Sequence, residues 1–157
     1  MYEYRAQIVK VVDGDTVDCD IELGFGVVLA DERVRIMGID TPESRTSDKV
    51  EKVFGLAAKK RLKELLGKEC ILKTQIAKNG EDMKGKFGRI LGDFIMEDDR
   101  MVTEVMADEG HCVPYYGGSK DETKSAHLAN RKRLLSEGVV NKADYDKAVS
   151  IMEKKNG

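Results

Sequence analysis

Two carboxylates and a guanidinium lie close together in the segment RIMGIDTPESR, residues 35–45. Arg35 opens the segment, Asp40 ends an apolar run, and Glu43 follows three residues later. Carboxylate oxygens bind hard cations, and an arginine presents a fork of donors that matches phosphate oxygens. The set can therefore hold a cation and a phosphate together, although solvated surface residues remain the plainer alternative.

A further carboxylate comes from the segment DGDT, residues 13–16, which taken alone is typical of a turn. Asp15 is in phase with Val17 in an alternating pattern, and Asp40 shares the parity of Val34. Both carboxylates are therefore expected to face the apolar side at the ends of neighbouring strands. Two inward carboxylates need a partner between them, because an unpaired buried charge is costly.

Two kinds of partner are compatible with this pair of carboxylates. Oxygen ligands without His or Cys suit calcium or magnesium better than a transition metal. The alternative is a salt bridge to Arg35 or Arg89 with no metal. Strand parity also places Arg35 opposite Asp40, so a bulge or a strong twist is expected to bring both side chains to one site.

These residues must be positioned by short strands. Alternating apolar residues and turn signals predict an antiparallel meander of three strands over the first forty residues, with a turn at residues 31–33. The five expected strands are residues 5–12, 17–23, 33–39, 69–77 and 89–96.

Helical spacing predicts a helix over residues 50–66, which Gly67 ends. Further helices are expected at residues 101–109, 122–136 and 142–154, and a short helical turn at 41–43. Asn141 is a suitable N-cap for the last helix. This order of elements predicts an α+β protein with a mainly β core, a five-stranded OB-fold barrel with three to four packed helices, in a single domain over residues 1–157.

The composition limits the class of protein. A chain of 157 residues with 36% charged and 41% hydrophobic residues is typical of one globular domain. The net charge of −2 provides no general basic field, so binding to a polyanion requires a local cluster of Lys and Arg. Cys19, Cys70 and Cys112 have no pairing pattern and are expected to be free thiols in a reducing compartment. No signal peptide or membrane span is visible, which favours a cytoplasmic location.

Five segments, in order, resemble the successive motifs of the staphylococcal nuclease (thermonuclease) family. They are VVDGDTV, RVRIMGIDTPE, KVFGLAAKKRL, GKFGRIL and MVTEVMADEGHCVPYY, which together cover roughly residues 5–117. The resemblance implies an OB-fold nuclease that depends on calcium and cuts DNA and RNA, leaving 3′-phosphates. The helical region from about residue 118 carries little specific match.

The same resemblance implies roles for individual residues. Calcium is expected on Asp15, Asp40 and the backbone carbonyl of Thr41, while Arg35 and Arg89 donate to the phosphate. Glu43 is expected to act as a base or to position the water. Substrate contacts are expected from Lys84, Lys86, Phe87, Tyr115 and Tyr116.

Some features depart from the family pattern or lie outside it. Phe87 stands where the family usually has Tyr, and Tyr115 and Tyr116 are adjacent where the family separates its pair by one residue. His111 and His127 lie in no motif and are expected to be ordinary polar residues near helices. We expect a monomer acting on single-stranded or frayed DNA and RNA. The alternative is a non-catalytic OB-fold module that binds nucleic acid or peptide.

Overall fold

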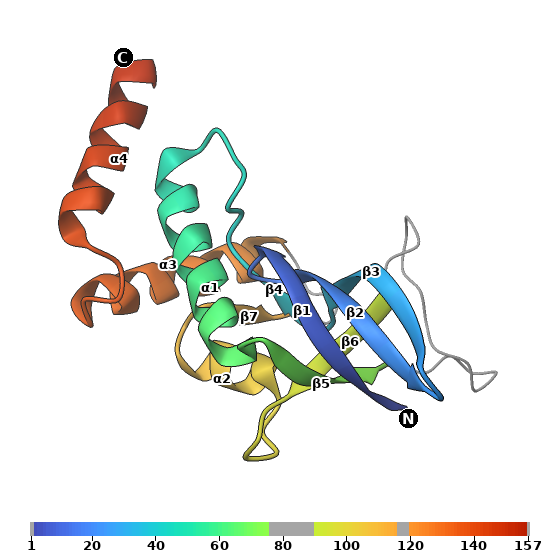
Figure 1. Cartoon of the computed structure of the whole chain (residues 1–157). Coiled ribbons are helices and arrows are strands. Elements are labelled where there is room, and N and C mark those ends of the chain that lie inside the picture. Colours follow the sequence, from blue (N-terminus) through green and yellow to red (C-terminus); the bar gives the residue numbers. More distant parts are fainter. Residues whose placement is uncertain (1, 76–89, 116–119, 157) are drawn as a thin grey trace.

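The computed structural model describes residues 2–75, 90–115 and 120–156. In this part of the chain, five strands close into a barrel in the order β1–β2–β3–β6–β5, and two short strands pair beside it (Figure 1). The barrel strands are β1 Glu3–Asp13, β2 Thr16–Gly24, β3 Val27–Ile36, β5 Glu69–Thr74 and β6 Ile90–Ile95. The short strands are β4 Ile39–Asp40 and β7 Val113–Pro114. The predicted OB-fold barrel is confirmed.

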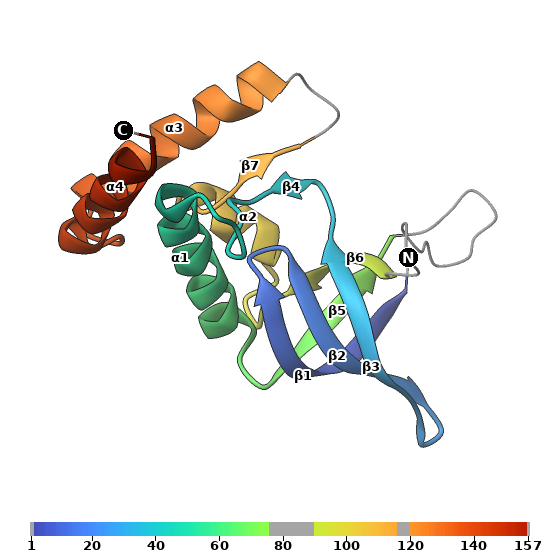
Figure 2. The same ribbon diagram turned by 90° about the horizontal axis from the view of Figure 1, so that it is seen from above.

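Helices cover the barrel from one side and extend beyond it (Figure 2). Four are present in the described residues: α1 Lys49–Leu66, α2 Val102–Asp108, α3 Lys120–Ser136 and α4 Lys142–Asn156. Their positions confirm the four expected helices to within a few residues. None of the helices in the described ranges combines the length and the apolar character that crossing a bilayer requires.

The first three strands form the expected antiparallel meander, but the turn expected at residues 31–33 is wrong. β3 runs without a break from Val27, and its register against β2 shifts between Cys19 and Ile21. Asp31 has a φ of 52°, and its N–H donates to Asp20 Oδ1 at 2.7 Å. The polar residues therefore form a bulge, which absorbs an extra residue without ending the strand.

The core of the barrel contains the residues that the alternating apolar pattern of the strands predicts to be buried. On β2, Val17, Cys19 and Ile21 are at most 2% exposed. α1 contributes Leu62 and Leu66 to the same core. All three cysteines are free, as expected.

The two ends of α1 are both capped, and the C-terminal end follows the predicted signal at Gly67. Asp48 Oδ1 accepts hydrogen bonds from the backbone N–H groups of Val50 and Glu51, at 3.0 and 3.1 Å, and so caps the N-terminus. Gly67 ends the helix with a φ of 62°, a conformation that glycine adopts without steric cost.

The helical turn expected at residues 41–43 is wrong, because this segment has no helical structure. Asp40 pairs with Val113 in the small β4–β7 sheet, so the chain enters the segment extended. Thr41 precedes Pro42, and a residue before proline is disfavoured in the α region. The segment then runs close to α1, where a Cβ on Gly55 would lie only 2.2 Å from the Glu43 carbonyl oxygen.

A second, smaller core joins the C-terminal helices to α1. Its buried residues are Phe54, Leu134 and Val140. The Phe54 ring also meets Tyr145 of α4 edge-on, with the ring centroids 5.9 Å apart. Asn141 caps α4 as predicted, since its Oδ1 accepts from the Ala143 N–H at 2.8 Å.

Candidate active site

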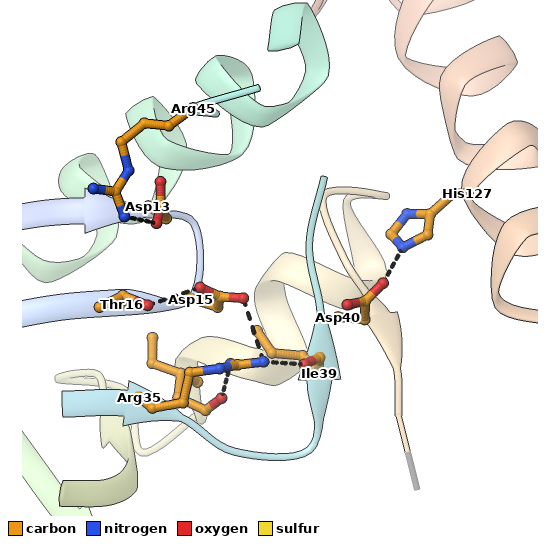
Figure 3. A network of polar contacts seen from close by, with 9 residues as sticks. Asp13, Asp15, Thr16, Arg35, Ile39, Asp40, Arg45 and His127 are labelled. Atoms are coloured by element: carbon orange, nitrogen blue, oxygen red, sulfur yellow. Dashed lines mark hydrogen bonds and ion pairs between the residues drawn. The ribbon is translucent and has the colours of Figure 1, made fainter. Parts of the chain in front are cut away.

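Asp15 lies in the turn between β1 and β2 and points toward β3 (Figure 3). Its Oδ2 is 3.3 Å from Arg35 Nη2, and its Oδ1 accepts a hydrogen bond from Thr16 Oγ1 at 2.9 Å. Its backbone carbonyl accepts from the Ile36 N–H at 2.7 Å. The Asp15 carboxylate is therefore fixed in direction by its own turn and by the end of β3.

Arg35 holds the turn between β3 and β4 in place. Its Nη1 donates to the Ile36 carbonyl, and its Nη2 donates to the Ile39 carbonyl at 3.2 Å. Gly38 lies in the middle of this turn with a φ of 79°. The turn interrupts the strand alternation, so Arg35 and Asp40 reach the same region despite their opposite parity. The expected bulge or twist is in fact a turn.

Asp40 lies on β4 and contacts a residue that sequence analysis did not select. Its Oδ2 is 2.7 Å from Nε2 of His127 on α3 (Figure 3). The Asp40 side chain is 43% exposed, whereas that of His127 is 16% exposed. His127 lies on a helix, as expected, and it also contacts Asp40, which was not expected. No local signal could have indicated this contact, because the two residues are 87 positions apart in the chain.

Glu43 is exposed and lies among other carboxylates. Desolvation by the surrounding protein raises the pKa of Glu43, and the negative charge of Asp15 raises it further, with Asp13 and Asp40 adding to the effect. Thr41 is buried, and its side chain would be 3.4 Å from a Cβ on Gly14. The segment from residues 41 to 43 is thus packed against the β1–β2 turn that carries Asp15.

The donor set fits a hard cation. In the described ranges, no three His, Cys, Asp or Glu side chains gather closely enough to hold a metal by themselves. A cation on Asp15 and Asp40 would therefore need further oxygen ligands, such as a carbonyl, water or phosphate, which calcium accepts. Desolvation is the main cause of the raised pKa of Glu43. The neighbouring carboxylates, led by Asp15, raise the pKa further, and a cation would offset that second contribution.

Asp13, the first acid of the DGDT segment, has a different role. It is 9% exposed, and it accepts hydrogen bonds from Ser44 Oγ and, at 3.0 Å, from Arg45 Nη2. Burial alone would raise the pKa of Asp13, but these hydrogen bonds outweigh it and lower the pKa. Asp13 thus joins the end of β1 to the chain immediately after Glu43. The sequence offered no signal for this role beyond the turn itself.

An open cavity of about 1250 Å³ lies beside Arg35. Met37, Pro114 and Tyr115 form part of its lining. Tyr115 is 49% exposed, and its backbone N–H donates to the Gly38 carbonyl at 2.9 Å, so it is attached to the turn that Arg35 holds. The cavity can accept a flat group stacked on the Tyr115 ring together with an anion beside the Arg35 guanidinium.

Five predicted site residues lie outside the described residues, and their roles remain predictions. They are Lys84, Lys86, Phe87, Arg89 and Tyr116. Arg35 and Tyr115 line the cavity, and Asp15 reaches this region through its ion pair with Arg35. His111, the other histidine, is buried just after the end of α2.

Comparison with known proteins gives one family match and two relatives. A family model described as "Staphylococcal nuclease homologue" matches residues 33–138. Endonuclease YhcR of Bacillus subtilis (strain 168) is 27% identical over 119 residues, which are 73% of this chain and 9% of that protein. The SPbeta prophage-derived endonuclease YokF of the same organism is 33% identical over 101 residues, 64% of this chain and 31% of that protein. The chain therefore spans less than a third of the length of either relative.

Proposed function

The chain belongs to the family of staphylococcal nuclease homologues, and on this premise we propose that it is a calcium-dependent, sugar-non-specific nuclease. It would hydrolyse phosphodiester bonds of DNA and RNA and leave 3′-phosphates. Two relatives named as endonucleases support the reaction class. The observation that carries the proposal is the Arg35–Asp15 pair, which places a phosphate-binding fork against a carboxylate at the edge of an open cavity.

Arg35 would bind and orient the scissile phosphate. A guanidinium has five N–H donors. Hydrogen bonds to the Ile36 and Ile39 carbonyls occupy two of them, and the contact with Asp15 is an ion pair. The remaining donors can reach phosphate oxygens without releasing the turn. Because the guanidinium is already fixed, it can stabilise charge that grows in the transition state at little reorganisation cost.

Asp15, Asp40 and the Thr41 carbonyl would hold calcium. When bound, calcium supplies positive charge that stabilises the phosphate and its transition state. Glu43, exposed beside these ligands, would accept a proton from the attacking water or hold that water in place. The water oxygen adds to phosphorus, and the bond to the 5′ oxygen breaks, so the phosphate stays on the 3′ side.

The cavity beside Arg35 would receive the neighbouring nucleotide. Tyr115 offers an exposed aromatic face on which a base or sugar can stack. We propose that Tyr116, Phe87, Lys84 and Lys86 complete this surface, with Arg89 as a second donor to the phosphate. A surface that stacks bases favours single-stranded or frayed substrates, since paired bases are not free to stack on a side chain.

The chemistry of the products tests this proposal. End-labelled single-stranded DNA and RNA of the same sequence would be incubated with the protein in calcium and then in chelator. We expect both substrates to be cut only in calcium, with a phosphate on the 3′ end of the upstream product and a hydroxyl on the 5′ end of the downstream product. Products that carry 5′-phosphates would contradict the assignment of the leaving oxygen.

A further inference from the structure

We infer that His127 is a positioning residue of the active site, which holds Asp40 in the orientation that metal binding requires and so makes α3 part of the site. The inference rests on the proposed function, because it gives Asp40 the role of a calcium ligand. It adds a residue that lies 87 positions away from Asp40 in the chain.

The contact leaves one carboxylate oxygen available. His127 Nε2 lies 2.7 Å from Asp40 Oδ2, and since the carboxylate can only accept, the imidazole donates. The histidine side chain is 16% exposed, whereas that of Asp40 is 43% exposed. The carboxylate is thus held from the enclosed side and remains open on the other, which is the arrangement of a metal ligand supported by an outer hydrogen bond.

The position of His127 is set by the rest of α3. His127, Asn130 and Leu134 have the i, i+3, i+7 spacing that places residues on one helix face. Asn130 Nδ2 donates to the Cys112 carbonyl at 3.4 Å, and Leu134 is buried against Phe54 in the second core. Three contacts of different kinds therefore hold the same face of α3 against the protein.

The contact of Asn130 also fixes the register of α3 relative to Asp40. Cys112 immediately precedes Val113, which is the pairing partner of Asp40 in the β4–β7 sheet. Asn130 of α3 is thus hydrogen-bonded to the residue that precedes the strand partner of Asp40. His127, one turn earlier on α3, contacts Asp40 itself. Arg131 of α3 also contacts Phe54 of α1, since its guanidinium carbon lies 5.3 Å from the centroid of the Phe54 ring.

Calcium affinity, measured by calorimetry in the presence of a nucleoside bisphosphate, tests the inference. His127→Leu removes the donor but retains an apolar side chain of similar size, and we expect it to weaken calcium binding about 10-fold or more. His127→Gln keeps an N–H at a similar reach and should restore the affinity to within about 3-fold of the parent. Ser125→Ala, an exposed change on the same helix, serves as the control and should leave the affinity unchanged.

A double-mutant cycle without calcium tests the contact independently of the function. Unfolding would be measured for His127→Leu, Asp40→Asn and the double variant. We expect the double variant to be more stable than the sum of the two single effects predicts, by about 3-fold or more in the unfolding constant. Additive effects would overturn the inference.

The outcomes separate this inference from the proposed function. If the parent binds calcium and His127→Leu binds it equally well or more tightly, the positioning role is overturned and the nuclease proposal stands. Tighter binding would mean that His127 competes with the cation for Asp40. If the parent does not bind calcium with the bisphosphate present, both the positioning role of His127 and the proposal of a calcium-dependent nuclease are overturned.

Discussion

Arg35 and Asp15 form an ion pair of 3.3 Å that joins the turn after β1 to the end of β3. Their side chains are only 24% and 17% exposed, so the pair is partly shielded from water. The pair holds the Asp15 carboxylate of the DGDT segment against the Arg35 guanidinium of the segment at residues 35–45. It therefore links the metal-binding part of the proposed site to the phosphate-binding part.

Replacing Arg35 by lysine should impair turnover more than substrate binding. Lysine keeps the charge but loses the fork that contacts Asp15, the Ile36 and Ile39 carbonyls and the phosphate together. We expect kcat to fall roughly 10²-fold or more, with a much smaller change in KM. Steady-state cleavage of single-stranded DNA measures both constants. An unchanged kcat would exclude Arg35 from transition-state stabilisation.

Gly55→Ala should destabilise the protein, although alanine favours helices. In an open helix this change would stabilise by roughly 1 kcal/mol. Here the added Cβ would lie 2.2 Å from the Glu43 carbonyl oxygen and 2.7 Å from the Ser44 nitrogen, both of which are backbone atoms. We expect a loss of about 2 kcal/mol or more in the free energy of unfolding.

Urea unfolding measures the effect of Gly55→Ala, and the neighbouring Leu56→Ala is the control. Leu56 is 46% exposed, so its truncation should change stability little. A Gly55→Ala protein as stable as the parent would mean that α1 and the Glu43 segment are farther apart than described. The same variant should also lower nuclease activity, because the clash displaces Glu43.

The stability of the protein should depend on pH through Glu109. Hydrogen bonds from Arg61, at 2.6 and 2.7 Å, lower the pKa of Glu109 below its ordinary value of 4.5. A lowered folded-state pKa contributes stability that is present above about pH 4.5 and is lost as the pH falls through the folded-state pKa. Glu109→Gln should thus be less stable than the parent at neutral pH.

The difference in the free energy of unfolding between the parent and Glu109→Gln should shrink as the pH falls below 4.5. Urea unfolding over a pH series measures it. Glu137→Gln is a matched control, because Glu137 pairs with Arg133 at the C-terminal end of α3 with both side chains about half exposed. A stability difference that stays constant across the acidic range would contradict the dependence of stability on the protonation of Glu109.

The sequence predicted the barrel because its signals are local. The alternation of Val17, Cys19 and Ile21 identified the buried face of β2, and Gly67 marked the end of α1. Of the two residues expected at strand ends, Asp15 lies in the turn between β1 and β2, and Asp40 is the last residue of β4.

What the sequence missed depends on contacts between distant segments. The turn at Gly38 interrupts the strand alternation between Arg35 and Asp40, whose parity is opposite, and this change of direction was not visible in the sequence. Asp31 has the polar character of a turn residue, but pairing on both sides of it converts the turn into a bulge. His127 meets Asp40 only because the packing of α3 on α1 brings them together.

In the proposed mechanism, Asp15 and Asp40 hold calcium for phosphodiester cleavage. The most direct test is the turnover of single-stranded DNA by the parent and by Asp40→Asn, each in calcium and in chelator, together with the DNA affinity of both proteins. We predict turnover by the parent in calcium only, and a fall of roughly 10²-fold or more in Asp40→Asn, because the metal stabilises transition-state charge by several kcal/mol. DNA binding by the parent without any cleavage in calcium would contradict the claim and would identify a binding module instead.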